Sequence, residues 1–392
     1  MTKRSDWAWP LWPIVPIYPY GQRRTLRREI VPGKLWLFEQ VQGIFYVVVP
    51  IRMTVIKLVG GGLFVFSPVA PTRECVRLVQ ELEAAHGEVK YVVLPTVTGL
   101  EHKYFAGPFA QKFKRAQVYV APNQWSFPVD LPLAWLGFPA KRTHYLPADP
   151  SETPFYDEFD YATVGPIELN VKPYTEVAFF HRETRSLLAI DTVLSIPLDP
   201  PAVVAQDPYP LMFHARDRAQ DPLIDTPDNR RKGWARIALF TFYFQPAALA
   251  VPSPKQALKD ATRSPNKSKK NYFGLYPFAW QPHWYQSFEA LQANGKLLVA
   301  PILQTLIFNR DPGAVLAWVD RMAQWDFQQI IPCHFSAPVM ATPPELRQAF
   351  DFLRQPNPSN WSGFDHNLPM ADLETLGQID RQLSGTVLPS SD

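Results

Sequence analysis

The chain has 392 residues, of which 46% are apolar and 19% are charged, and its formal net charge at pH 7 is +3. This composition is typical of a globular protein, and so small a net charge gives no indication of a nucleic-acid partner. The length fits two or three domains, or one domain that carries a large insertion. The 42 prolines against 18 glycines indicate short elements joined by rigid loops.

Cysteines and long apolar runs are both scarce. Cys75 and Cys333 are the only cysteines, too few for a disulfide framework, and we therefore expect a reducing compartment. No stretch of the sequence approaches the roughly 18 to 20 uninterrupted apolar residues that a membrane span requires. We expect no transmembrane span.

Residues 1–34 are predicted to form an arm. Tryptophan and tyrosine alternate here with proline, and four arginines follow. Proline interrupts any apolar helix, so this pattern is not that of a signal peptide. One interpretation is an extended arm whose aromatic side chains pack on the body of the protein. The other is an interfacial anchor, with aromatic side chains at headgroup level and arginines on anionic lipid.

Residues 35–68 are rich in strand-forming residues. Short runs of them are separated by Gly43, by Pro50 and by the glycines at 60–62. The three glycines lie between two such runs and predict an antiparallel hairpin. Residues 71–86 then carry apolar side chains at helical spacing, and the glycine at 87 predicts the end of that helix.

A short β-branched run at 92–94 gives way to turn-forming and ionisable residues that end at Glu101 and His102. This pattern is typical of a buried strand that presents polar side chains at its end. Residues 106–113 have the residue pattern of a helix start, and residues 116–122 have the composition of another strand. A strand, a polar loop, a helix and a strand make one α/β unit.

The order of these elements, together with residues 96–102, resembles the metallo-β-lactamase superfamily. In that superfamily the corresponding strand ends in Thr-His-x-His-x-Asp-His, whose side chains bind two metal ions. In this sequence Val97 and Gly99 stand at the positions of two of the histidines. Glu101 stands at the position of the aspartate, and His102 is retained. Half of the signature is therefore absent.

Two segments, 101–109 and 124–128, are similar to a narrower group, an uncharacterised family of oxygenic phototrophs called domain of unknown function 4336. This resemblance covers most of the chain but implies no activity. It implies a cytoplasmic location, in the cyanobacterial cytoplasm or the plastid stroma, with peripheral attachment to a membrane as an option.

The superfamily pattern continues along the chain. Residues 177–191 look like its two-strand stretch that ends in the aspartate bridging the two metals, a role that falls on Asp191. The third histidine of the first metal site would lie near Lys172. Residues 330–334 are similar to the strand that ends in Pro-x-His, so His334 takes the place of the last ligand. Helices are predicted at 315–325 and 343–352.

The resemblance sorts the candidate residues into two metal sites. None of the first-site side chains binds a metal in the normal way, since lysine is cationic and the other two have no donor atom. The second-site residues are two imidazoles and two carboxylates, a sufficient set for one zinc or iron ion. The first-site positions are Val97, Gly99 and Lys172, and the second-site residues are Glu101, His102, Asp191 and His334.

The same residues also allow a cleft without metal. Lys172 would then pair its ammonium with Asp191, because a buried carboxylate needs such a partner or becomes protonated. Cys333, next to His334, is predicted to be a buried structural thiol, because adjacent side chains of a strand point to opposite faces. The remaining histidines are not expected to be ligands.

Residues 197–316 are predicted to be an insertion that the superfamily pattern does not explain. They hold a charged stretch, an apolar run at 237–251 that is too short to span a membrane, and a basic loop; helices are expected at 280–291 and 296–308. One interpretation is a lid or subdomain over the cleft that selects the substrate. The other is peripheral membrane contact through residues 7–28 and 237–270.

We therefore predict an α+β protein, a metallo-β-lactamase-like αβ/βα four-layer sandwich. Its parts would be the arm (1–34), the first part of the core (35–196), the insertion (197–316), the last strand and helices of the core (317–355) and a tail (356–392). Two functions are expected from this chain. One is a mononuclear metal-dependent hydrolase of an unidentified small molecule; the other is a non-catalytic binding or assembly protein at a membrane surface or a protein partner.

Overall fold

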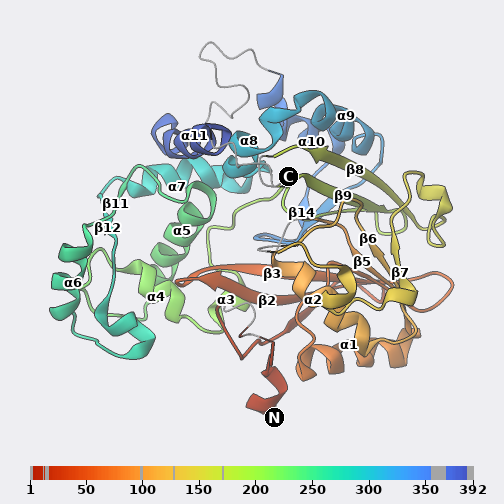
Figure 1. The fold of residues 1–392 in the computed structure, drawn as a ribbon, viewed down its shortest axis with the longest axis horizontal. Coiled ribbons are helices and arrows are strands. Elements are labelled where there is room, and N and C mark those ends of the chain that lie inside the picture. The colour runs from red at the N-terminus through yellow and green to blue at the C-terminus, as the bar shows by residue number, and fades with distance from the viewer. Residues whose placement is uncertain are drawn as a thin grey trace.

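The computed structural model describes residues 3–11, 13, 17–97, 100–126, 129–169, 172–354 and 368–385, with the backbone alone at 100, 101 and 383–385. Two β-sheets organise these residues (Figure 1). One sheet has seven strands in the order β1-β2-β3-β4-β5-β6-β7, and the other has five in the order β14-β13-β10-β9-β8. A further two-stranded sheet, β11-β12, lies in the segment predicted to be an insertion.

The seven-stranded sheet is antiparallel in its first half and parallel in its second. β3 and β4 pair antiparallel, which confirms the hairpin predicted at the three glycines. From β4 to β7 the strands are parallel, and α1 and α2 make two of the crossovers that such strands require. Thr72 caps α1, and Gly87 ends it with a φ of 96°, as predicted. The bounds are β1 (Leu26–Val31), β2 (Leu35–Ile44), β3 (Val47–Lys57), β4 (Leu63–Phe66), α1 (Arg73–His86), β5 (Val89–Leu94), α2 (Leu100–Lys112), β6 (Gln117–Val120) and β7 (Thr143–Tyr145).

The five-stranded sheet joins segments that are far apart in the sequence. β10 and β13 pair in parallel, with Ala189 opposite Pro332 at the end of the register. Asp191 and His334 each lie two residues beyond that pair, so the sheet delivers both to the same edge. The bounds are β8 (Phe159–Ile167), β9 (Tyr174–His181), β10 (Ser186–Ala189), β13 (Gln329–Pro332) and β14 (Val339–Met340).

The layers follow from three clusters of buried apolar side chains. One lies between the sheets and contains Leu37 and Phe64 from the first sheet with Phe179 and Leu188 from the second. Another joins the outer face of the seven-stranded sheet to α1 and α2, and the third joins the five-stranded sheet to α9 (Pro312–Met322) and α10 (Pro343–Ala349). Helices thus cover the outer face of each sheet (Figure 1), and the predicted αβ/βα four-layer sandwich is confirmed.

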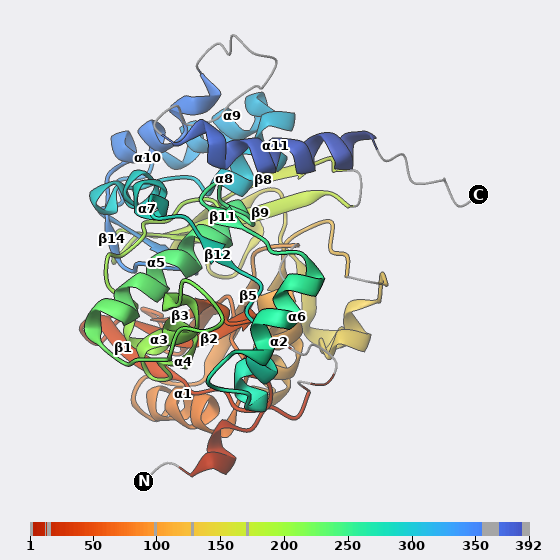
Figure 2. The same cartoon turned by 90° about the vertical axis from the view of Figure 1, so that its left-hand side faces the viewer.

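The segment between β10 and α9 forms a mostly helical body beside the two sheets, turned toward the viewer in Figure 2. Its apolar residues share one core with the five-stranded sheet. The two helices predicted at its end are shorter than expected, because β12 precedes the first and Pro301 starts the second. The bounds are α3 (Ala202–Ala205), α4 (Tyr209–Ala215), α5 (Pro227–Tyr243), β11 (Leu249–Ala250), α6 (Pro254–Thr262), β12 (Ala279–Trp280), α7 (Trp284–Gln292) and α8 (Pro301–Leu306), and α11 (Met370–Gly385) ends the described chain.

The arm packs on the body of the protein. Trp9 and Tyr18 are buried, and the Arg27 and Arg28 side chains form ion pairs with Glu81 and Glu39. Trp9 and Tyr18 are therefore not available to a lipid surface, and some other arm residues, Trp12 among them, lie outside the described part. Most of the apolar stretch that starts at residue 237 is likewise buried, in α5. None of the described helices is both long and apolar enough to cross a membrane.

Candidate metal centre

Asp191 and His334 meet at the edge of the five-stranded sheet. The His334 Nε2 atom lies 2.9 Å from the Asp191 Oδ1 atom. The His334 side chain is buried, and the Asp191 side chain keeps part of its surface in solvent. The structure therefore brings together two of the predicted second-site residues, which are distant in the sequence.

His102 reaches the same place from the seven-stranded sheet. It lies in the first turn of α2, is buried, and its ring centroid is 6.3 Å from that of His334, with the ring planes at 53°. The predicted ligand Glu101 is adjacent in α2, but its side chain is outside the described part, as is Gly99. Three of the four second-site residues thus belong to one neighbourhood.

Two proline carbonyl groups fix the orientation of the histidine rings. The Nδ1 atom of His102 is 3.1 Å from the Pro68 oxygen, and the Nδ1 atom of His334 is 2.9 Å from the Pro50 oxygen. A carbonyl oxygen only accepts hydrogen bonds, so we assign the proton of each ring to Nδ1. Nε2 is then the atom that carries the lone pair, and rings that bind a metal through Nε2 are commonly held in this way.

The contact between His334 and Asp191 requires one more positive charge. With Nδ1 of His334 committed to Pro50, the Nε2 atom faces a carboxylate oxygen, and both atoms carry lone pairs. A proton between them satisfies the contact, and so does a metal ion that binds both. Metal binding at this place therefore competes with a proton.

A buried ion pair holds the loop that carries His334. The Arg52 guanidinium donates to the carbonyl oxygens of Pro332 and Phe335, the latter at 2.8 Å, and binds Glu39 at 2.7 Å. Burial alone would raise the pKa of Glu39, but the guanidinium groups of Arg52 and Arg28 hold that pKa below its usual value. The pair therefore stays ionised, and it fixes the backbone on both sides of His334.

A second buried carboxylate, that of Glu176 in β9, holds the segment that carries Asp191. It accepts hydrogen bonds from the backbone N–H groups of Ile190 (2.9 Å) and Asp191 (3.2 Å) and from the Thr192 hydroxyl (2.8 Å). Tyr174 also donates to it, at 2.7 Å. Burial and the nearby Asp191 carboxylate raise the pKa of Glu176. We did not predict this residue, although a single acid in the apolar strand 174–181 was a visible signal.

The positions that match the first metal site have other roles. Val97 is buried in the cluster between the sheets. Lys172 lies at the surface and pairs with Asp130 at 3.1 Å, so the predicted pairing of Lys172 with Asp191 is wrong. Instead Lys103 is the buried lysine of this region, and its ammonium donates to the carbonyl oxygen of Val97. Burial lowers the pKa of Lys103 to about 8.

Cys333 behaves as predicted, as a buried free thiol. Burial raises its pKa far above the usual value, which keeps the free thiol protonated at neutral pH. Among the side chains that the structure describes, no three from histidine, cysteine, aspartate and glutamate are grouped closely enough to hold a metal ion. The carboxylate of Glu101 is not part of that set.

Comparison with protein families identifies the chain. The family described as domain of unknown function (DUF4336) matches residues 32–352. The chain belongs to this family. The match takes in the whole five-stranded sheet, the seven-stranded sheet from β2 to β7, and every described candidate residue of this DUF4336 protein. A search of curated proteins gave no match.

Solved structures similar to this DUF4336 protein include metallo-β-lactamases and flavodiiron proteins. The metallo-β-lactamase FIM-1 from Pseudomonas aeruginosa, in its mono-zinc form, has 9% identity and a TM-score of 0.36 over 92% of this chain and 97% of its own. A flavodiiron core from Synechocystis has 9% identity and a TM-score of 0.40 over 85% of this chain and 62% of its own. A metallo-β-lactamase from Pontibacter korlensis has 11% identity and a TM-score of 0.34 over 45% of this chain and 76% of its own. At these values no activity transfers to this chain.

Proposed function

We propose that this protein binds one divalent metal ion, zinc or iron, through His102, Asp191, His334 and Glu101, and uses it to hydrolyse a small molecule. The observation that supports the proposal is the orientation of the two rings. Each has its Nδ1 atom on a proline carbonyl, and the Nε2 atom of His334 lies beside Asp191. Two imidazoles and a carboxylate suit either metal.

The residues of the chain supply the rigidity that such a site requires. The carbonyl groups of Pro50 and Pro68 orient the imidazoles, and the Arg52 guanidinium holds the backbone on both sides of His334. Glu176 holds the backbone N–H of Asp191. A metal bound here would polarise a substrate oxygen and activate water for attack, which makes hydrolysis the expected reaction.

A single metal is proposed because the first-site positions offer no ligand set. Val97 is apolar and buried between the sheets, and Lys172 is engaged with Asp130. The buried ammonium of Lys103, close to the Val97 carbonyl, also disfavours a second cation in this region by charge repulsion.

The experiment is reconstitution of metal-free protein with one equivalent of Zn²⁺ or Fe²⁺, followed by assays with simple esters, thioesters and phosphodiesters. We expect hydrolysis and a raised melting temperature that depend on the metal, and their loss in His334→Ala. His144→Ala is the matched control, since His144 is an exposed histidine in β7. Unchanged melting and no hydrolysis with either metal would contradict the proposal and favour the non-catalytic alternative.

A further inference from the structure

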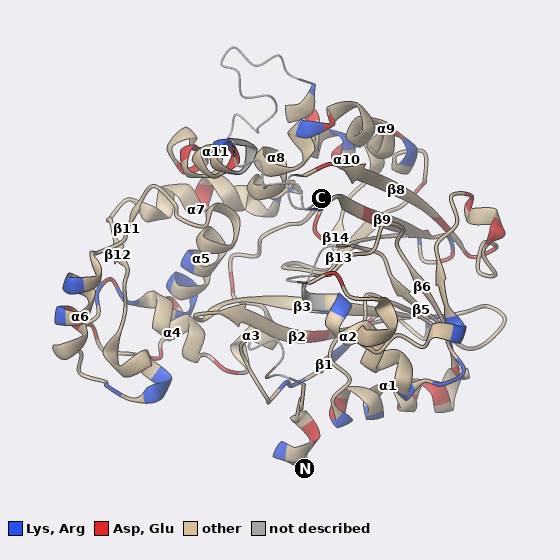
Figure 3. Ribbon diagram, viewed as in Figure 1, with Lys and Arg blue, Asp and Glu red and all other residues tan. Residues whose placement is uncertain are grey.

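Residues 251–274, which we call the basic lobe, have a formal net charge larger than that of the whole chain. They contain six cations (Lys255, Lys259, Arg263, Lys267, Lys269 and Lys270) and one acid, Asp260, so their formal charge is 6 − 1 = +5. The whole chain has +3, and the remaining residues therefore sum to −2. The lobe comprises α6 and the 3-10 helix η5 (Lys269–Gly274), at the edge of the molecule away from the two sheets (Figure 3).

Large apolar side chains stand in solvent among these cations. The exposed fraction is 68% for Phe273, 65% for Leu258 and 56% for Val251. Removing a side chain of this size from water is favourable, so each of the three would gain from a partner that covers it. All three belong to the same lobe, so a partner on this lobe would have several apolar side chains to contact.

The backbone of η5 is held in a disfavoured conformation that presents Phe273. Tyr272 has φ 46° and Phe273 has φ 57°, both in the left-handed region, and Gly274 follows at 91°. L-residues with large side chains rarely adopt this region. It places the partly buried Tyr272 against the core while Phe273 stays exposed, and backbone of this kind persists only where the surrounding contacts hold it.

Inward contacts tie the lobe to the body of the protein. The Tyr272 ring stacks on Phe45 at the tip of the β2–β3 hairpin, with centroids 4.3 Å apart, and the Tyr46 hydroxyl donates to the Lys270 oxygen at 2.8 Å. At Gly274 an added Cβ would lie 2.7 Å from the Ala261 oxygen, so η5 packs closely against the end of α6. The backbone that carries Phe273 is therefore held in place by contacts with the rest of the protein.

We propose that the basic lobe docks on an anionic lipid bilayer, with Phe273 and Leu258 entering the interface and the cations near the headgroups. Aromatic and aliphatic side chains flanked by lysine are the composition that binds such surfaces. Five of the six cations are lysine, a residue that protein–protein interfaces deplete, which favours lipid over a protein partner. Docking through this lobe does not require a metal at the candidate centre.

Vesicle flotation tests the proposal, with one population of phosphatidylcholine and another that also contains phosphatidylglycerol. The full chain should float with the anionic vesicles and not with the neutral ones, and added salt should release it. Phe273→Ser should weaken partitioning by about tenfold or more, since a buried Phe side chain contributes about 1.5 to 3 kcal/mol. Lys255→Gln with Lys259→Gln should weaken it roughly fivefold per lysine.

Matched controls come from other exposed positions. Trp135→Ser removes an aromatic side chain that is 77% exposed outside the lobe, and Lys112→Gln with Lys114→Gln removes two exposed lysines. Both controls should float as the unaltered protein does, and circular dichroism should show every variant folded. Equal binding to neutral vesicles, or equal loss in the controls, would overturn the proposal. So would the absence of any flotation, which would leave an acidic protein surface as the partner.

Discussion

Arg52 is a buried cation whose hydrogen bonds fix the loop of His334. Its side chain is fully buried and shares Glu39 with Arg28. Removal of Arg52 would leave the buried Glu39 carboxylate with the partly exposed Arg28 alone, and the carbonyl groups of Pro332 and Phe335 would lose their donor. Losing one partner of a buried ion pair costs more than the pair contributes. The candidate centre therefore depends on a residue that would touch neither metal nor substrate.

We predict that Arg52→Met lowers the free energy of unfolding by about 3 to 5 kcal/mol. Adding Glu39→Gln should recover part of that loss, because it removes the charge left behind. Urea denaturation measures the free energy of unfolding of the single and the double variant. Arg115→Met is the control, since its exposed pair with Glu88 contributes about 0 to 1 kcal/mol. A loss for Arg52→Met no larger than for this control would contradict the prediction.

The buried His214 makes the stability of the fold depend on pH in the acid range. Its Nε2 atom lies 3.2 Å from the Phe45 oxygen, and burial lowers its pKa to about 3, with Arg216 and Arg236 adding to the shift. The unfolded value is about 6.5, so the unfolded chain binds more protons between pH 6.5 and 3. This contribution to stability is complete above pH 6.5 and is lost as the pH falls.

We therefore expect His214→Gln, whose amide can replace the Nε2 donor, to be less sensitive to acid than the unaltered chain. Between pH 7 and pH 5 the free energy of unfolding of the unaltered chain should fall by about 2 kcal/mol more than that of the variant. His181, whose pKa is lowered to about 4 by burial, gives a slope of the same sign to both proteins. Parallel pH profiles in urea denaturation would refute this role of His214.

Helices α4 and α5 approach each other closely at a glycine. A Cβ added at Gly233 in α5 would lie 1.8 Å from the Leu211 oxygen of α4. Arg236, one turn later, donates to the carbonyl oxygens at the end of α4, among them that of Arg216 at 2.7 Å. The two helices are thus joined by backbone contact and by a buried cation.

Gly233→Ala should destabilise the protein although alanine is the better helix former. The clash with backbone should cost about 1 to 3 kcal/mol, beyond the gain in propensity. Gly313→Ala in α9 is the control, since its nearest neighbour would be the Asp311 Oδ1 atom at 3.8 Å, and we expect a neutral or stabilising effect. Thermal unfolding measures the stability of both variants. Equal melting temperatures for Gly233→Ala and Gly313→Ala would contradict the account of this contact.

Local signals in the sequence predict local structure well. The glycines at 60–62 and Gly87 act through their own backbone conformations, so the hairpin and the end of α1 follow directly from them. The pairing of β10 with β13 is non-local, and no local signal in the sequence predicted it. Charges within strands, such as Arg52 and Glu176, have partners that depend on the whole fold, which a single sequence does not reveal.

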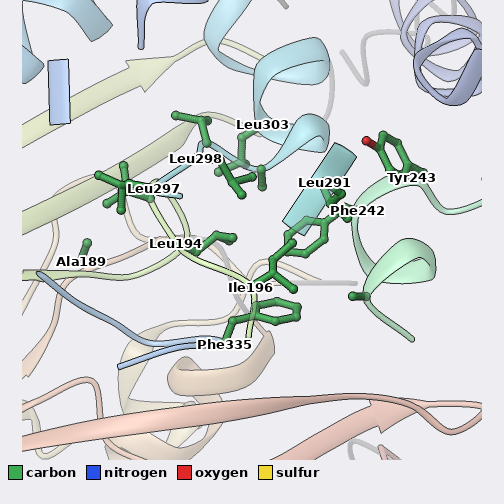
Figure 4. Packing of buried hydrophobic residues seen from close by; sticks show 14 of the residues in the cluster. Ala189, Leu194, Ile196, Phe242, Tyr243, Leu291, Leu297, Leu298, Leu303 and Phe335 are labelled. Atoms are coloured by element: carbon green, nitrogen blue, oxygen red, sulfur yellow. The ribbon is translucent and has the colours of Figure 1, made fainter. Parts of the chain in front are cut away.

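At the scale of the whole molecule, the helical body between β10 and α9 packs against the chain segments that follow Asp191 and His334. Phe335, which follows His334, packs on Phe242 of α5 with centroids 4.8 Å apart. Leu194 bridges to Leu298, which joins the chain after Asp191 to the same body, and Figure 4 shows these side chains in one cluster. Its predicted role as a lid that selects substrates stays a prediction.

The central claim is that one metal ion binds where the two sheets bring His102, Asp191 and His334 together. Elemental mass spectrometry tests it on protein purified without chelator or nickel. We predict about one zinc or iron per chain, lost in His102→Ala and in His334→Ala and retained in His144→Ala. No metal in the unaltered protein after reconstitution, or full retention in both ligand variants, would contradict the claim.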